Sequence, residues 1–136
     1  MTDLQIAKSG LTGHTVCLCK GGKTIVSDKR GISPIMDFIA EGVDLRGYAV
    51  ADLVVGKAVA MLFARCGISA VFAKTLSYGG KAVLEKYEIP FGYETLTEKI
   101  INRAGNDICP MEKAVASTED LEEAYALLKE KISRTE

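Results

Sequence analysis

The longest apolar stretch of the chain runs from Tyr48 to Cys66 (YAVADLVVGKAVAMLFARC), and only Asp52, Lys57 and Arg65 carry charge within it. Its composition of Ala, Leu, Met and Val is compatible with a helix, so we predict one helix of about five turns. Because apolar residues lie on nearly every side of that helix, we expect it to be buried rather than half exposed. The charges inside the stretch argue against a membrane span. The rest of the chain is expected to cover this helix.

Two short segments before this stretch are rich in β-branched and apolar residues and predict a hairpin. The strands are expected over 14–19 (HTVCLC) and 24–27 (TIVS). Gly21 and Gly22 lie between them, and paired glycines tolerate the positive φ angles that a two-residue turn requires. A short helix over 2–10 is predicted to precede the hairpin.

Capping signals mark the boundaries of the remaining elements. Ser33 followed by Pro34 predicts a helix that ends at Gly42, and Gly67 is placed to end the central helix. The later expected elements are a buried strand over 68–76, a helix over 80–87 capped by Ser77, a strand over 88–96, a helix from Pro110, and a helix over 121–132 capped by Ser117 or Thr118.

The order of these elements indicates an α/β fold. A strand pair followed by alternating helices and strands implies a mixed sheet with helices on both faces. The length of 136 residues is typical of a single domain, which we expect to span residues 1–136.

Composition excludes several functional classes. The net charge is −1 with 26% charged residues, which gives no electrostatic footprint for nucleic acid or for an anionic membrane. The first ten residues lack the apolar run of a signal peptide, so a cytoplasmic location is expected. The four cysteines form no CxxC pair and the single histidine is His14, so neither a metal site nor a cofactor is expected. Cys17 and Cys19 are expected to be reduced core residues.

A repeated tetrapeptide marks two predicted helix starts. Gly-Lys-Ala-Val occurs at 56–59 and again at 80–83, and a capping side chain precedes each copy, Asp52 and Ser77 respectively. In an α/β sheet such starts can lie side by side at one edge. The start of a helix carries partial positive charge and free N–H groups, so it binds anions.

The residues within the repeat suit a ligand pocket but have a simpler explanation. Gly56 lets a ligand approach the backbone, and Lys57 and Lys81 add positive charge. The sharper hypothesis is therefore a pocket for a small anion or nucleotide between the two starts. The alternative is that the glycines only permit close packing. The sequence is not a Walker motif, because Ala follows each lysine where Ser or Thr is needed.

A second group of polar residues lies in the segment 101–112 (INRAGNDICPME). Arg103 can grip a carboxylate or phosphate, and Asn102 can orient a ligand. Cys109 precedes a helix start, where a thiolate is stabilised, so it is a candidate nucleophile or redox-sensitive thiol. The alternative makes Cys109 a buried cap and Glu112 an ordinary first-turn acid.

The phrases DLVVGKAVAML and NRAGNDICPMEKAV, together with the order of elements, resemble a small uncharacterised prokaryotic domain family. That family is grouped by structure within the cytidine deaminase-like superfamily, and the resemblance covers the chain from about Val16 to Leu128. It implies a three-layer α/β/α sandwich with a mixed sheet. It also implies that five residues converge at one site, namely Asp52, Lys57, Ser77, Arg103 and Cys109.

The wider superfamily performs zinc-dependent deamination with a His- or Cys-x-Glu motif at one helix start and Pro-Cys-x-x-Cys at the next. Neither of the starts identified above contains histidine or cysteine. The resemblance therefore implies a metal-free, deaminase-like domain, and deaminase activity is not expected from the fold alone.

Three hypotheses of different classes follow. In the first, the domain binds a small anionic or nucleotide-like ligand through Asp52 and Ser77, with Lys57 and Arg103 neutralising its charge. In the second, it is an enzyme of unassigned type that uses Cys109 as nucleophile or Lys57 as base. In the third, it is a structural or assembly module in which Asp52 and Lys57 form a satisfied pair. The apolar central helix is compatible with a homo-oligomer.

Overall fold

The computed structural model describes residues 1–101, 105 and 107–135, and the expected site residues Asn102 and Arg103 lie outside them. In the described part the chain forms a mixed five-stranded sheet in the order β2-β1-β3-β4-β5. The strands are β1 (Val16–Lys20), β2 (Lys23–Ser27), β3 (Ala49–Val55), β4 (Ala70–Ser77) and β5 (Phe91–Thr97). The helices are α1 (Asp3–Gly10), α2 (Ser33–Ala40), α3 (Lys57–Cys66), α4 (Tyr78–Lys86), α5 (Pro110–Val115) and α6 (Leu121–Thr135).

The predicted hairpin is confirmed as β1 and β2. These strands pair antiparallel with Lys20 opposite Lys23, so Gly21 and Gly22 form a two-residue turn. Their φ angles of 59° and 81° are the left-handed values that such a turn requires. β1 also pairs antiparallel with β3, whereas β3, β4 and β5 are parallel to one another.

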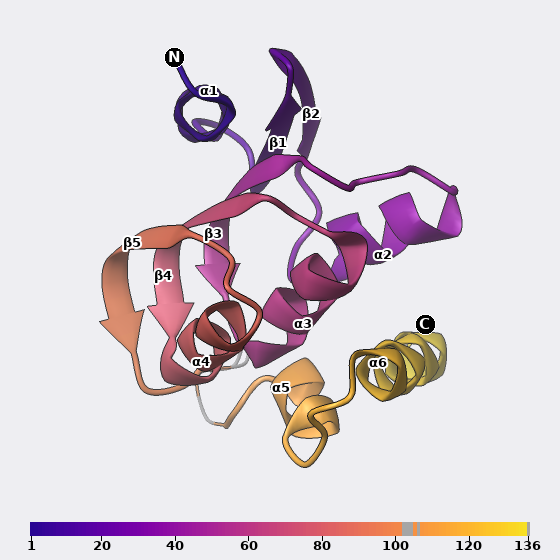
Figure 1. Cartoon of the computed structure of the whole chain (residues 1–136). Coiled ribbons are helices and arrows are strands. Elements are labelled where there is room, and N and C mark those ends of the chain that lie inside the picture. The colour runs from indigo at the N-terminus through magenta and orange to yellow at the C-terminus, as the bar shows by residue number, and fades with distance from the viewer. Residues whose placement is uncertain (102–104, 106, 136) are drawn as a thin grey trace.

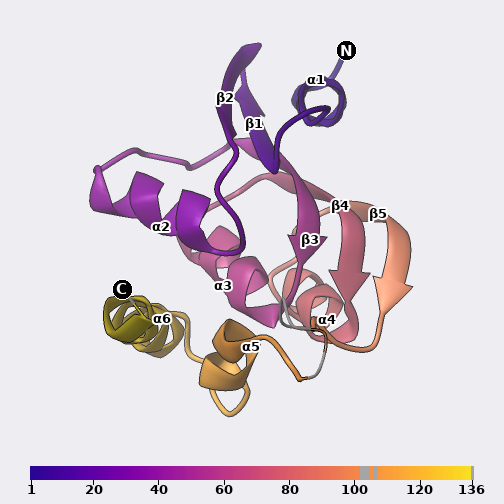
Figure 2. The same cartoon turned by 180° about the vertical axis from the view of Figure 1, so that it is seen from behind.

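Helices cover both faces of the sheet, as the order of elements predicted (Figures 1 and 2). Helix α1 packs on one face against a small cluster that includes Cys17, Cys19 and Ala51, so both of these thiols are core residues as expected. Helices α2, α3 and α4 pack on the opposite face against Val16 and Val50. Helices α5 and α6 lie beyond α3, on its side away from the sheet.

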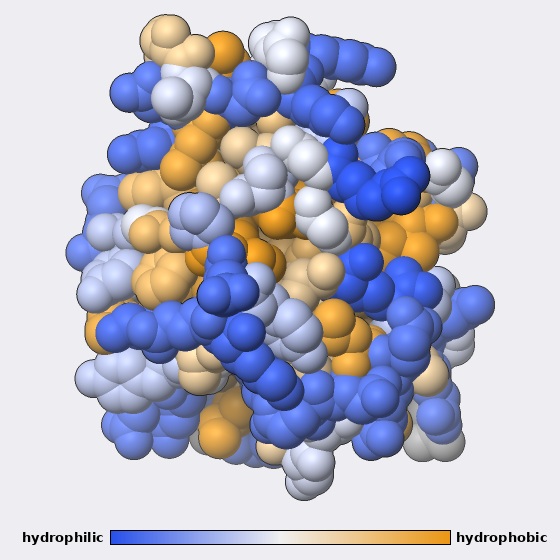
Figure 3. Space-filling model, in the orientation of Figure 1, coloured by the Kyte–Doolittle hydropathy of each residue, from blue (hydrophilic) through white to orange (hydrophobic). Residues whose placement is uncertain are grey.

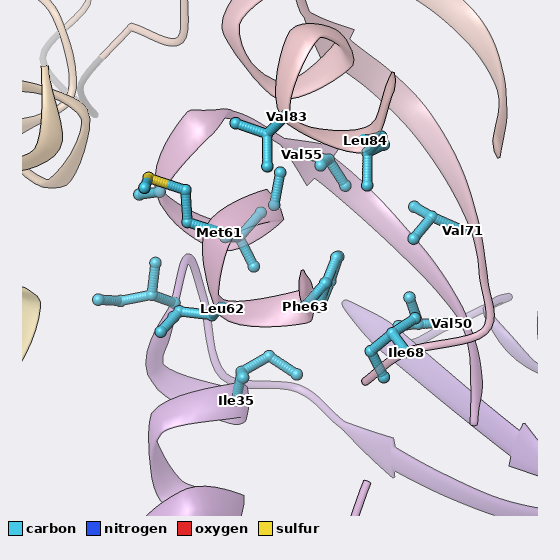
Figure 4. Packing of buried hydrophobic residues seen from close by; sticks show 14 of the residues in the cluster. Ile35, Val50, Val55, Met61, Leu62, Phe63, Ile68, Val71, Val83 and Leu84 are labelled. Atoms are coloured by element: carbon cyan, nitrogen blue, oxygen red, sulfur yellow. The ribbon is translucent and has the colours of Figure 1, made fainter. Parts of the chain in front are cut away.

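Helix α3 is the centre of the main core (Figure 4). Its residues Met61, Leu62 and Phe63 are at most 1% exposed, and they lie among side chains of α4, the sheet and Ile35 of α2. The prediction that the chain is built around a buried helix therefore holds for α3, but only for the second half of the predicted stretch.

The prediction of one helix over 48–66 is wrong. Its first part is the strand β3, its second part is α3, and Gly56 is the turn between them. Four residues of β3 in succession are buried because neighbouring strands flank it and helices cover both faces. A strand buried in this way has the same continuous apolar pattern as a buried helix, so periodicity alone could not separate the two. Asp52 consequently lies inside a strand and caps no helix.

The predicted caps are partly confirmed. Ser77 caps α4, because its Oγ accepts a hydrogen bond of 3.0 Å from the Gly80 N–H. Ser33 is instead the first residue of α2, and the residue at the capping position is Ile32, whose side chain accepts no hydrogen bond. At α6 the cap is Asp120, which accepts from Glu123 N at 2.9 Å, rather than Ser117 or Thr118.

Hydrophilic residues cover most of the face seen in Figure 3, and they separate the hydrophobic residues into small patches. Among the helices that the structure describes, none is both long and apolar enough to cross a membrane.

Candidate functional site

A cavity of about 330 Å³ lies where β3 ends and α3 begins. It is lined by Thr15, by the connection that leads into α2, by the last residues of β3, by the first turn of α3 and by the start of α5. Segments distant in sequence therefore meet at this cavity. Its walls include the apolar side chains of Ile32, Pro34, Val59 and Met111. A cavity of this size and composition suits a small organic molecule.

Asp52 is the buried acid of this cavity. It lies on β3 between Val16 of β1 and Ala73 of β4, on the sheet face that packs against α3. The residue is only 8% exposed, and its Oδ1 accepts a hydrogen bond of 3.4 Å from Val54 N. Within the described residues, no lysine, arginine or histidine forms an ion pair with Asp52.

The buried position changes the acidity of Asp52. Burial raises the pKa of its carboxyl group from 3.8 to about 7, although hydrogen bonds from Val54 and Leu53 oppose the shift. Near neutral pH the carboxyl group is therefore divided between its charged and neutral forms. Such a group can accept or donate a proton, and strongly perturbed acids in cavities are candidates for functional residues.

Glu112 of α5 lines the same cavity and covers the start of α3. Its Oε1 accepts from Lys57 N at 2.8 Å and its Oε2 accepts from Ala58 N at 2.7 Å. Burial raises the pKa of the Glu112 carboxyl group, while these two N–H donors act in the opposite direction. An anion thus does occupy the start of α3, but it is a side chain of the chain itself.

Both glycines of the repeated tetrapeptide permit close packing. A Cβ at Gly56 would lie 2.2 Å from Oε1 of Glu112, and a Cβ at Gly80 would lie 2.9 Å from the carbonyl oxygen of Val55. The two helix starts are therefore side by side, as predicted. Their glycines are explained by contacts within the protein, which supports the simpler of the two interpretations of the repeat.

The remaining polar groups at these helix starts face elsewhere. Nζ of Lys57 donates to the carbonyl oxygen of Ala116 at 3.2 Å and to Oε1 of Glu119 at 3.0 Å, so its partner is Glu119 and not Asp52. The hydroxyl of Ser77 is engaged by its cap. Lys81 is half-buried on α4 and does not line the cavity.

The structure thus brings together four of the predicted site residues, namely Asp52, Gly56, Cys109 and Glu112, at one cavity. Cys109 is half-buried at the start of α5, and its side chain caps no backbone group. Sequence reasoning missed the contribution of Thr15 and of the connection before α2. The only signal for the latter was its polar loop, Asp28-Lys29-Arg30-Gly31.

That connection forms the polar rim of the cavity. Lys29 and Arg30 line it, and Lys29 forms an ion pair with Asp37 of α2. The hydroxyl of Thr15 holds the backbone of the connection, because its Oγ1 lies 2.9 Å from the carbonyl oxygen of Ser27 and 2.5 Å from that of Lys29. Positive charge is therefore at the rim, and carboxyl groups are inside.

Comparison with known protein families shows which family the chain belongs to. A family model described as "TM1506: Domain of unknown function (DUF1893)" matches residues 7–132. The chain belongs to the DUF1893 family. The expected resemblance to an uncharacterised domain family is therefore confirmed at this level.

A solved structure agrees with this assignment. The crystal structure of a DUF1893 family protein (TM1506) from Thermotoga maritima matches with a TM-score of 0.82 and 24% identity, covering 98% of this chain and 91% of that one. At this identity the likeness supports the α/β fold alone. Comparison with curated proteins found none that matches. The function of this DUF1893 domain must therefore be argued from its own cavity.

Other concave surfaces of the DUF1893 domain are less suited to a ligand. A wider groove of about 760 Å³ lies between α1 and the sheet. Its charged residues Lys8, Lys74 and Glu94 are exposed to solvent. The cavity at β3 instead combines apolar walls with a buried acid, which is the usual combination in small-molecule sites.

Proposed function

We propose that this DUF1893 domain binds a small nucleobase-like molecule in the cavity at the end of β3, and that Asp52 is its anchor. The observation that carries the proposal is the buried carboxyl group of Asp52, which lines an apolar cavity without an ion-pair partner in the described part of the chain. Such a group is costly to bury, and a ligand that hydrogen-bonds to it would offset the cost.

The chemistry of the cavity supports a ring that bears N–H groups. A carboxyl group accepts hydrogen bonds from exocyclic amino groups of bases, and in its protonated form it also donates. The apolar side chains of Ile32, Val59 and Met111 suit the faces of such a ring. A ligand with a carboxylate or phosphate directed at Asp52 is disfavoured, because Glu112 adds a second acid to the same cavity.

In this proposal the ligand lies in the cavity beside the start of α3, and not between the starts of α3 and α4. The N–H groups of Lys57 and Ala58 already donate to Glu112, and that of Gly80 donates to Ser77. A ligand at those groups would have to displace a side chain. Binding in the cavity requires no such displacement.

We further propose that the fold is the three-layer α/β/α sandwich of the cytidine deaminase-like superfamily. Support comes from the helices on both faces of the mixed sheet. The cytoplasmic location and the homo-oligomer stay predictions from the sequence. Light scattering coupled to size-exclusion chromatography would measure the oligomeric state.

Binding is tested by NMR titration of the ¹⁵N-labelled protein with adenosine, guanosine, cytidine, uridine and the free bases. For at least one of these compounds we expect changes in the backbone amide chemical shifts of Asp52, Val54, Gly56 and Ala58. Asp52→Ala should lower the affinity for that ligand about tenfold or more, which corresponds to the loss of one hydrogen bond to a charged group.

The matched control is Asp44→Ala, which removes an exposed carboxylate outside the cavity. It should leave the affinity unchanged. If none of these compounds shifts the cavity amides of the folded wild-type protein, the proposal is wrong. It is equally wrong if Asp52→Ala, shown to be folded by circular dichroism, binds as tightly as the wild type.

The second candidate function is an enzyme in which Cys109 is the nucleophile, as the sequence suggested. The observation in its favour is that Cys109 lines the same cavity as Asp52, a group able to take up a proton near neutral pH. Iodoacetamide at neutral pH should then label Cys109 faster than it labels Cys66, which is also half-buried. Equal or slower labelling of Cys109 would count against a nucleophile.

A further inference from the structure

The start of α2 differs from the other helix starts at the cavity. Ile32 is its capping residue and supplies no side-chain hydrogen bond, and the first turn contains no acidic residue. By contrast, Glu112 occupies the start of α3. The partial positive charge at the start of α2 is therefore unopposed by any side chain of that turn.

Arg30 lies immediately before this helix start and lines the same cavity. Its side chain is exposed, and it forms no hydrogen bond or ion pair with any of the residues described. The backbone around it is fixed by the Thr15 hydroxyl, which lies 2.5 Å from the carbonyl oxygen of Lys29. The ion pair between Lys29 and Asp37 also holds this connection against α2. Arg30 is thus an uncommitted cation on an anchored segment.

A second observation, independent of the helix start, indicates that the cavity is a ligand site. Asp52 is 8% exposed and lines the cavity, and its carboxyl group has no ion-pair partner among the described residues and accepts a long hydrogen bond of 3.4 Å from Val54 N. The cavity is therefore acidic on its buried side and basic at its rim. A molecule that fits this distribution has a hydrogen-bond donor at one end and a negative charge at the other.

We infer that the ligand of this cavity is a nucleotide-like phosphomonoester, whose phosphate is bound at the rim by Arg30 and the start of α2. The inference rests on the proposed function, since the ring of the same ligand would occupy the space beside Asp52. Pro34 supplies no N–H group to the first turn of α2, and the Ser33 N–H already donates to the carbonyl oxygen of Arg30 at 3.2 Å, so the Arg30 side chain is expected to provide most of the attraction. Guanidinium groups bind phosphate through two parallel hydrogen bonds.

The test compares each nucleoside with its 5′-monophosphate by isothermal titration calorimetry. For the base that binds, the monophosphate should bind the wild-type protein at least about tenfold more tightly than the nucleoside, as one charge-assisted contact predicts. Arg30→Gln should reduce the affinity for the monophosphate to that for the nucleoside, and it should leave the nucleoside itself unaffected. The advantage of the monophosphate should also shrink as salt is raised.

Arg46→Gln is the matched control, because it removes the same charge from an exposed arginine that does not line the cavity. It should preserve the advantage of the monophosphate. Equal affinities of nucleoside and monophosphate for the wild type would overturn this inference and leave the proposed function standing. An advantage that survives in Arg30→Gln would also overturn it. Failure of every nucleoside and monophosphate to bind would overturn both.

Discussion

Replacing Asp52 by asparagine should change how the stability of this domain depends on pH. The pKa of the Asp52 carboxyl group is raised from 3.8 to about 7 in the folded protein, because burial disfavours its charged form. Between those two values the folded protein retains a proton that the unfolded chain releases. The free energy of unfolding therefore falls as pH rises through this range, and it levels off above the folded pKa.

The magnitude follows from linkage. Between about pH 5 and about pH 8, a carboxyl group with these two pKa values lowers the free energy of unfolding by about 2 to 3 kcal/mol. Asparagine has nearly the same shape and no charge at any pH. The free energy of unfolding of Asp52→Asn, relative to that of the wild type, should therefore increase by this amount as the pH rises from about 5 to about 8.

Urea denaturation of both proteins at several pH values measures this difference. The other ionisable groups, including Glu112 with its raised pKa, are present in both proteins and cancel in the comparison. The control is Asp44→Asn, because the pKa of Asp44 is lowered to about 2 by hydrogen bonds from Arg46. Asp44 titrates below the pH range studied, so the stability of Asp44→Asn relative to the wild type should stay constant across that range.

A relative stability of Asp52→Asn that stays constant within about 0.5 kcal/mol from about pH 5 to about pH 8 would refute the reasoning. It would mean that the carboxyl group is ionised in the folded protein at neutral pH. Asp52 would then need a cationic partner or water, and the argument for an unpaired acid in an apolar cavity would fail.

Four other variants test packing at Gly56 and Gly92, the contact between α3 and α6, and the position of the ligand site. Gly56→Ala should destabilise the protein by about 2 to 4 kcal/mol in urea denaturation, because its Cβ would lie 2.2 Å from Glu112, whereas Gly92→Ala, with nothing within 4 Å, should cost under about 1 kcal/mol. Arg65→Met should cost about 1 kcal/mol, because it removes a guanidinium that lies 4.0 Å from the ring centroid of Tyr125 and pairs with Glu122. Lys57→Gln should leave nucleoside affinity within about twofold of wild type in calorimetry, since Nζ faces Glu119; a large loss would favour a site at the helix starts.

Much of the fold could be predicted from local signals. The Gly21-Gly22 turn, the Ser77 cap and the Pro110 helix start depend on residues close together in sequence, and each is present in the structure. The boundary between β3 and α3 could not be located in the same way. Apolar residues predominate in both the strand and the helix, and only the tertiary contact between Gly56 and Glu112 shows why the chain turns at that residue.

The site, like the fold, has features that the sequence predicts and features that depend on contacts between distant segments. The acids and the cysteine that line the cavity stood out in the sequence as polar residues in unusual positions. Their partners did not, because Glu112 reaches the backbone of Lys57 from 55 residues away. The role of Arg30 was also hidden, since it depends on the connection before α2 lying against the end of β3. Sequence spacing carries no information about contacts of that range.

The most direct test of the account is a crystal structure of the protein with the nucleoside that binds most tightly. The account predicts that the ligand occupies the cavity at the end of β3, with an N–H group of its ring within hydrogen-bond distance of the Asp52 carboxyl group. A ligand bound elsewhere while this cavity remains empty would contradict it.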